Sequence, residues 1–191
     1  RKKVGLPDKP TAAYSGGFYE GRGLDAVLDL AGHFPQVNFL LIGGTDQLIK
    51  AWKEKAALAG LSNVVFTGFI QNTKLPIYQA AADILLMPYS KKVSGSSGGD
   101  IASVSSPMKM FEYMASGRII LASDLPVLRE VLDESNAVFA PIGDLEALRT
   151  RFGEIINDLD RYRRLGEKAR NDVRQYEWRN RMKKILDRFY S

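Results

Sequence analysis

A lysine and a glutamate three residues apart, Lys109 and Glu112, are the residues best suited to chemistry in this sequence. They stand in the segment SSPMKMFEYMASG, residues 105–117, which follows a polar loop and reads as a helix. Ser106 is a suitable N-cap, and Pro107 suits the first helical position because it has no amide hydrogen to leave unpaired. The open amides of the first turn, the helix dipole and the Lys109 ammonium together predict an anion site.

The spacing of Lys109 and Glu112 also indicates which anion would fit. Residues three apart project from the same face of a helix, about one turn from each other. The lysine and the helix amides could hold the phosphates of a nucleoside diphosphate while the carboxylate accepts hydrogen bonds from two ribose hydroxyls. A capped helix with an ordinary Lys/Glu pair has the same pattern, so spacing alone leaves both interpretations open.

A second candidate anion site lies in the glycine-rich segment YSGGFYEGRGL, residues 14–24. Glycines let the backbone approach a ligand closely, and Arg22 could bind phosphate through two parallel hydrogen bonds. Gly16, Gly21 and Gly23 do not form the G-x-G-x-x-G motif, and the sequence has no G-x-x-x-x-G-K-[ST] loop. NAD binding and ATP hydrolysis therefore lose support, and a tight turn between strand and helix would explain the same glycines.

Both segments must be positioned by the elements around them, and short apolar runs predict six buried strands. These runs are 12–15, 37–42, 64–67, 84–87, 119–122 and 137–140. Amphipathic stretches of helical period lie between the runs, for example from Leu24 to Ala31 and from Leu48 to Gly60. The alternation predicts an α/β fold with a doubly wound parallel sheet. Ligands bind such a sheet at the carboxyl ends of its strands, where both candidate sites fall.

The last part of the chain is predicted to be helical. Asp144 and Asp158 can each cap a helix, the second of which would run to about Val173. A third helix would carry an apolar face made of Trp178, Met182, Ile185, Leu186 and Phe189. Trp52 and Trp178 sit on apolar helix faces, so we expect both to pack in the core or at an interface.

The chain is expected to be a piece of a longer protein, because it lacks an initiator Met and opens in a polar segment. We divide it into a linker at residues 1–10, a ligand-binding domain at 11–173 and a terminal helix at 174–191. Residues 91–100, which are mostly small and polar, are expected to form a mobile loop.

Composition narrows the function classes. The chain has 45% hydrophobic and 26% charged residues, no cysteine and a net charge of +5, which fit a soluble cytoplasmic domain. Residues 149–188 contain thirteen Lys and Arg against seven Asp and Glu. This basic tail could contact an anionic membrane surface or could simply be a solvated helix face, and nucleic acid binding is not expected.

The sequence offers few residues for a metal site or for a Ser-His-Asp triad. The only histidine, His33, is interpreted as a surface residue at a helix end, which argues against a multi-histidine centre. Asp158 and Asp160 match a D-x-D pattern, but they stand at the start of a helix rather than at the end of a strand, so we interpret them as capping residues. No metal and no cofactor are predicted.

Several segments together resemble glycosyltransferase family 4, a group 1 family with the two-domain GT-B fold. The segment SPMKMFEYMASGRIILAS, residues 106–123, is similar to the family's S-P-x-K-x-x-E-Y-M-A-x-G signature. Other landmarks occur in family order: GRG at 21–23, FTGFI at 66–70, IYQAAADI at 77–84 and YEW at 176–178. The match runs from about residue 10 to the end of the chain.

The resemblance implies a Rossmann-like C-terminal half that binds the donor of a metal-independent, retaining hexosyl transfer. The donor would be a nucleoside-diphosphate sugar, and the acceptor a glycan or lipid-linked molecule held by a missing N-terminal domain. Arg22 and Lys109 would be catalytic, because they would stabilise the charge that grows on the diphosphate. The donor-binding residues would be Gly16, Gly17, Phe69, Ile70, Ser106, Pro107, Met108 and Glu112.

Two positions depart from the family pattern. Val104 stands where many members have the first Glu of E-x7-E, a residue assigned near the sugar. Gly17 stands where many members have an Arg, and Lys91 or Lys92 could replace its phosphate contact. Two other functions therefore stay open: an epimerase of the same two-domain architecture, and a module that binds a nucleotide sugar or a partner without catalysis.

Overall fold

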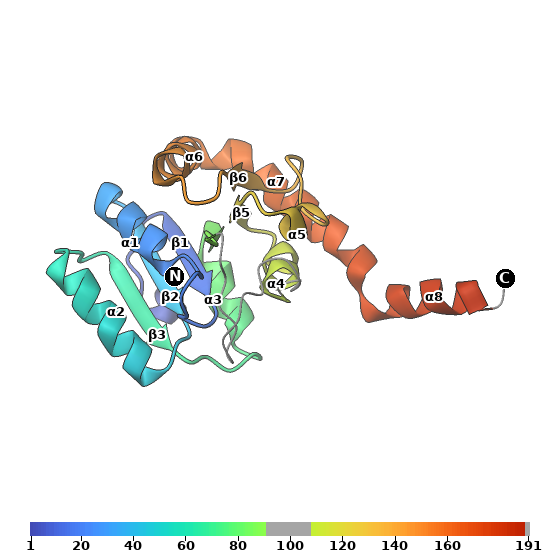
Figure 1. The fold of residues 1–191 in the computed structure, drawn as a ribbon, viewed down its shortest axis with the longest axis horizontal. Helices are drawn as coiled ribbons and strands as arrows, with labels where there is room; N and C mark the ends of the chain where they lie inside the picture. Colours follow the sequence, from blue (N-terminus) through green and yellow to red (C-terminus); the bar gives the residue numbers. More distant parts are fainter. Residues whose placement is uncertain (91–107, 190–191) are drawn as a thin grey trace.

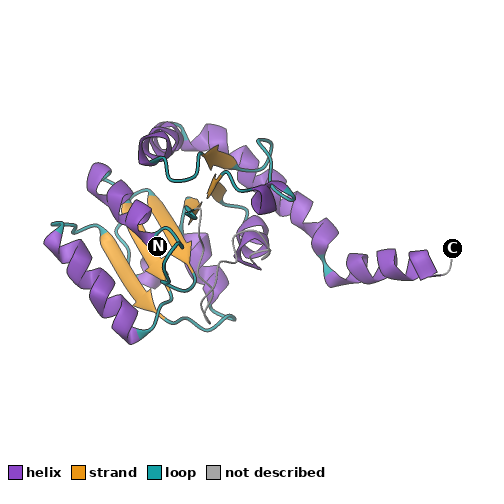
Figure 2. Cartoon of the chain, viewed as in Figure 1, coloured by secondary structure: helices purple, strands orange, loops and turns teal. Residues whose placement is uncertain are grey.

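In the computed structural model, which describes residues 1–90 and 108–189, the chain forms a six-stranded parallel sheet with helices on both faces (Figure 1, Figure 2). The spatial strand order is β3-β2-β1-β4-β5-β6, so the winding reverses between β1 and β4. The strands are β1 (Thr11–Ser15), β2 (Asn38–Ile42), β3 (Val64–Gly68), β4 (Ile84–Met87), β5 (Ile119–Ser123) and β6 (Val138–Ala140). The prediction of a doubly wound parallel sheet is confirmed.

Helices connect the strands and cover the sheet. They are α1 (Leu24–His33), α2 (Asp46–Leu58), α3 (Leu75–Ala81), α4 (Met108–Ser116), α5 (Pro126–Arg129), α6 (Leu145–Asn157), α7 (Leu159–Asp172) and α8 (Trp178–Phe189), with 3-10 turns η1 (Lys2–Val4) and η2 (Val173–Tyr176). One core cluster joins α1, α2 and α6 to the sheet, and a second joins α4, α5 and α7 to its other face. The domain therefore has three layers.

Alternation along the strands explains the two clusters. In β4, Ile84 and Leu86 belong to one cluster, while Leu85 and Met87 belong to the other. Successive side chains of a strand point to opposite faces, and all four of these residues are fully buried. A continuous apolar run is what a parallel strand needs when helices cover both faces of its sheet.

The predicted caps are present. The amide of Ala147 donates to the Asp144 carboxylate over 2.9 Å, and the amide of Arg161 donates to Asp158 over 3.1 Å. Asp158 therefore caps α7 as predicted, and this helix ends at Asp172, one residue before the predicted end. Short helices α3 and α5 were not predicted, because each is too short to show a helical period.

The two ends of the chain pack differently from each other. Within residues 1–10, predicted as a linker, Leu6 is buried in the core and the Arg1 guanidinium pairs with the buried carboxylate of Asp83. The far end, α8, extends away from the body of the domain (Figure 1). Trp52 packs against the core as expected. Trp178 is 74% exposed, so the prediction that it packs in the core is wrong for this domain.

Candidate functional site

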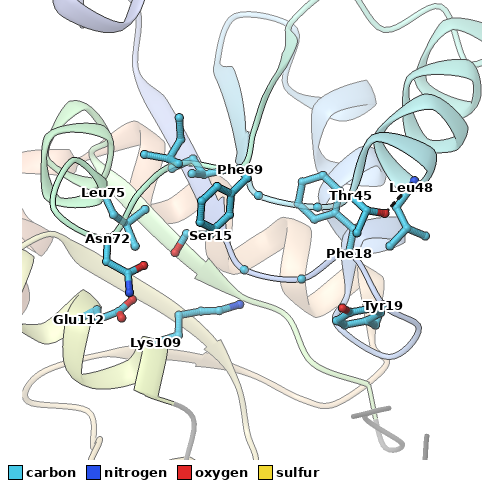
Figure 3. A pocket seen from close by; sticks show the side chains of 16 residues that line it. Ser15, Phe18, Tyr19, Thr45, Leu48, Phe69, Asn72, Leu75, Lys109 and Glu112 are labelled. Carbon is cyan, nitrogen blue, oxygen red and sulfur yellow. Dashed lines mark hydrogen bonds between the residues drawn. The ribbon is translucent and has the colours of Figure 1, made fainter. Parts of the chain in front are cut away.

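A cavity of about 400 Å³ opens at the carboxyl ends of β1, β2 and β3, where the strand order predicts a ligand site (Figure 3). Its walls come from the loops after these strands and from the first turns of α4. The lining residues comprise Ser15, Gly16, Gly17, Phe18, Tyr19, Ile42, Gly43, Gly44, Thr45, Leu48, Phe69, Ile70, Asn72, Leu75, Lys109 and Glu112. Six of the residues named from the sequence thus lie around one cavity: Gly16, Gly17, Phe69, Ile70, Lys109 and Glu112.

Lys109 reaches from α4 across the end of β1. Its ammonium nitrogen is buried, and within the described part of the chain it has no hydrogen-bond partner. It lies over the ring of Tyr14, 3.7 Å from the ring centroid, and 5.3 Å from the centroid of Tyr89. Burial lowers the pKa of Lys109 well below its usual value, the nearby charge of Arg22 lowers it further, and Glu112 opposes both effects. Glu112 therefore acts on Lys109 only through its charge, and no carboxylate of the described residues forms a hydrogen bond with the ammonium.

Glycines make room for this lysine and for the turn beneath it. A Cβ on Gly16 would lie 3.2 Å from both Cε and Nζ of Lys109, and Gly16 has a φ of 138°, which side-chain-bearing residues rarely adopt. A Cβ on Gly43 would lie 2.4 Å from the carbonyl oxygen of Gly16. Gly43 therefore lets the loops after β1 and β2 touch, and Gly16 leaves room for Lys109.

A buried polar network links the end of β1 to α3 and α4. The hydroxyl of Tyr113 accepts a hydrogen bond from the Ser15 amide at 2.8 Å and lies 3.3 Å from the Ser15 hydroxyl. The side-chain amide of Gln79 donates a hydrogen bond to the Ser15 hydroxyl over 3.5 Å. Because α4 carries both Tyr113 and Lys109, this bond between α4 and β1 fixes where the lysine stands.

The rest of the cavity wall includes a carboxylate, an amide and an aromatic ring. Glu112 is exposed, and together with Asn72 and Leu75 it also lines an adjoining cavity of about 260 Å³. Figure 3 shows Asn72 directed toward Glu112, with the 78% exposed side chain of Phe69 nearby. Phe69 and Ile70 follow directly after β3, and both line the cavity.

Other predicted residues lie apart from the cavity or outside the described chain. The Arg22 guanidinium lies 5.7 Å from the centroid of the Tyr89 ring, close enough to influence Lys109 but not among the lining groups. Met108 is 68% exposed and lines a separate apolar groove with Phe111 and Trp178. Ser106 and Pro107 lie outside the described residues, as do Val104, Lys91 and Lys92.

Several lining residues were missed. Tyr19, Thr45, Asn72 and Leu75 lie on loops or at helix starts and carry no motif of their own. Tyr14 is the second-last residue of β1 and Tyr89 lies two residues after β4, but no sequence signal shows that these two strands are adjacent. Gly43-Gly44 after a predicted strand was the one available signal, because paired glycines there favour close approach of a ligand or backbone.

The described residues contain neither a candidate metal centre nor a candidate membrane span. No group of three or more His, Cys, Asp or Glu side chains is arranged to hold a metal ion there. In the same residues, no helix combines the length and the apolar character needed to cross a membrane.

Comparison with known proteins identifies the family. The family model described as glycosyl transferases group 1 matches residues 9–158, more than half of the chain, and the chain belongs to this family. The sulfoquinovosyl transferase SQD2 of Arabidopsis thaliana is 25% identical over 196 residues, which cover 100% of this chain and 35% of the relative. The chain therefore spans about a third of that relative's length.

Solved structures show the same fold. The sucrose-phosphate synthase of Thermosynechococcus elongatus superposes with a TM-score of 0.81 at 24% identity, over 100% of this chain and 48% of that one. HepE of Anabaena, in complex with UDP-glucose, gives a TM-score of 0.76 at 18% identity, over 92% of this chain and 46% of that one. The fold is that of one half of these two larger GT-B proteins.

Proposed function

We propose that this chain, a member of the group 1 glycosyl transferases, is the donor-binding half of a retaining hexosyltransferase that uses a nucleoside-diphosphate sugar. One observation carries the proposal: the buried ammonium of Lys109 has no hydrogen-bond partner among the described residues and borders a cavity at the strand ends. An unpaired buried cation is costly, so a site that keeps one is suited to an anionic ligand.

The cavity has the parts that such a donor requires. Lys109 would hold the diphosphate, and Glu112, one helical turn away, would accept hydrogen bonds from the ribose hydroxyls. The backbone at Phe69 and Ile70 would face the base. HepE, which shares this fold, was solved with UDP-glucose, and that supports a nucleotide sugar as the donor here.

The proposed reaction replaces one bond at the anomeric carbon with another. The bond from this carbon to the diphosphate oxygen breaks, the acceptor hydroxyl oxygen takes its place, and the acceptor's proton passes to the departing diphosphate or to water. Lys109 and Arg22 would stabilise the negative charge that develops on the leaving group, an electrostatic role that needs no metal ion. The retained configuration is carried over from the resemblance to family 4.

The acceptor would be bound by a second domain. The chain spans about half of its structural neighbours, so we propose that residues 1–10 link it to an acceptor-binding half and that the helix at 174–191 packs toward that half. The acceptor would be a glycan or a lipid-linked molecule in the cytoplasm, with the basic tail near a membrane surface. The 191-residue chain alone should bind a donor weakly and transfer nothing.

The test uses a longer form of the protein that includes the proposed acceptor half. Release of nucleoside diphosphate is measured with UDP-, GDP- and ADP-sugars, for the unchanged protein and for Lys109→Met and Lys74→Met. Lys74 is exposed and does not line the cavity, so it serves as the matched control. We expect one donor class to be consumed, with activity lost only in Lys109→Met.

Other outcomes would redirect the proposal. Consumption of a donor without transfer, with epimerised sugar recovered, would favour the epimerase. No consumption of any donor, with binding intact, would favour a non-catalytic binding module. Proton NMR of the product decides the stereochemistry, and an inverted anomeric configuration would overturn the retaining assignment.

A further inference from the structure

We propose that Tyr14 and Tyr89 are positioning residues for Lys109, whose ammonium they hold between two aromatic rings in place of a carboxylate partner. The observation is geometric: the nitrogen lies 3.7 Å from the Tyr14 ring centroid and 5.3 Å from that of Tyr89. The role in donor binding rests on the function proposed above. The ring contacts themselves are a property of the free protein.

Aromatic rings suit this task better than an acidic side chain would. The face of a ring attracts a cation through its quadrupole, and the attraction strengthens when the cation is removed from water. A carboxylate in the same place would neutralise the lysine and repel an incoming diphosphate. Two rings stabilise the position of the ammonium without adding a negative charge beside it.

Both rings are buried. Tyr14 is fully buried, its hydroxyl donates to the Gly17 carbonyl oxygen over 2.9 Å, and its ring lies 6.1 Å from that of Phe18. Tyr89 is 3% exposed, and its carbonyl oxygen accepts a hydrogen bond of 2.8 Å from the Ser123 hydroxyl. Neither ring can turn away without breaking core packing, so the two rings restrict the flexible lysine stem to one place.

The rings come from the two faces of the sheet. Tyr14 belongs to the cluster that contains α1, α2 and α6, and Tyr89 to the cluster that contains α4 and α5. Tyr14 is the second-last residue of β1 and Tyr89 lies two residues after β4, and these two strands are adjacent at the point where the winding reverses. Gly16 lacks a side chain that would block the path of Lys109 between them.

The first part of the test needs no nucleotide. The chain is labelled with ¹³C at the ε-carbon of lysine, and the Lys109 signal is identified by its loss in Lys109→Arg. A methylene held over a ring face is shifted upfield, so we expect an upfield-shifted Lys109 ε-proton signal that persists in Tyr14→Phe and Tyr89→Phe. Tyr14→Leu and Tyr89→Leu should move it toward the other lysines. An unshifted signal in the unchanged protein would overturn the proposal, even if the leucine variants failed to fold.

The second part measures UDP, GDP and ADP affinity by calorimetry in the same variants. We expect the nucleotide that binds to bind about tenfold more weakly in Tyr14→Leu, while Tyr14→Phe stays near the unchanged protein. Equal affinity in all variants would show that the rings do not position the lysine for the ligand. If no nucleotide binds but the shifted signal is present, the proposed function fails for this chain while the ring contacts stand.

Discussion

Two cations of this domain lie over aromatic rings at nearly the same distance, yet they have opposite surroundings. The Lys109 ammonium is 3.7 Å from the Tyr14 ring centroid, and the Arg129 guanidinium carbon is 3.6 Å from that of Phe139. Arg129 also pairs with Asp124 at 2.7 Å and with Glu134 at 2.6 Å. Lys109 has no hydrogen-bond partner in the described chain.

The comparison indicates that Arg129 has a structural role, whereas Lys109 is available to a ligand. The hydrogen bonds that Arg129 donates to its partner carboxylates raise its pKa, whereas burial and the charge of Arg22 lower the pKa of Lys109. A satisfied cation on the surface stabilises its own loop by a small amount. An unsatisfied cation at a cavity costs stability in the free protein, and a bound anion can repay that cost.

The largest expected effect is on nucleotide binding. Lys109→Met should weaken the binding of a nucleoside diphosphate by about 3 kcal/mol, roughly a hundredfold, because it removes a buried charge that faces the phosphates. Arg129→Met, the matched change at the paired cation, should leave the affinity unchanged. Isothermal titration calorimetry of both variants checks the pair, and equal losses would erase the distinction between the two cations.

Gly16→Ala should affect both stability and binding. The substitution forces a side chain into a φ of 138° and places a Cβ 3.2 Å from the lysine nitrogen, so we expect a loss of about 2 kcal/mol of stability together with weaker binding. Gly143→Ala is the control, since Gly143 has a φ of 76° with nothing within 4 Å of its added Cβ. Chemical denaturation and calorimetry should show that the control loses stability alone.

A smaller effect concerns the free protein. Lys109→Met should raise the free energy of unfolding by about 1 kcal/mol near neutral pH, because an unpaired buried charge is removed. The pKa of Lys109 is lower in the folded than in the unfolded state, so its destabilising effect is complete below the folded pKa. The advantage of the variant should shrink as the pH rises through that value toward 10.5. Urea unfolding across this range measures it, and an advantage that grows with pH would contradict the assignment.

The smallest effect is expected at the paired cation. Arg129→Met should lower the free energy of unfolding by under about 1 kcal/mol, because its ion pairs are largely exposed to solvent. High salt should reduce the difference between this variant and the unchanged chain. Thermal unfolding at two salt concentrations tests this, and a large loss that salt leaves unchanged would argue for a deeper role of Arg129.

Much of the fold was accessible from the sequence, because its signals are local. Continuous apolar runs predicted all six strands to within about a residue or two at their ends, and Asp144 and Asp158 predicted two helix starts through their capping side chains. Lys109 and Glu112 stood out because their spacing on one helix is also local. What could not be predicted depends on contacts between distant segments. The approach of Tyr14 and Tyr89 to Lys109 follows only from the adjacency of β1 and β4, and the exposure of Trp178 follows from the direction in which α8 leaves the domain.

The most direct test of the account is thermal unfolding of the chain with millimolar UDP, GDP, ADP and CMP, repeated on Lys109→Met and Arg129→Met. A ligand at one hundred times its Kd stabilises a protein by about 2.7 kcal/mol, which corresponds to a rise in Tm of roughly 5–10 °C for a domain of this size. The account predicts that one diphosphate raises the Tm of the unchanged chain and of Arg129→Met, but not of Lys109→Met. An equal rise in all three proteins, or no rise with any nucleotide, would contradict the claim that this cavity binds a nucleoside diphosphate through Lys109.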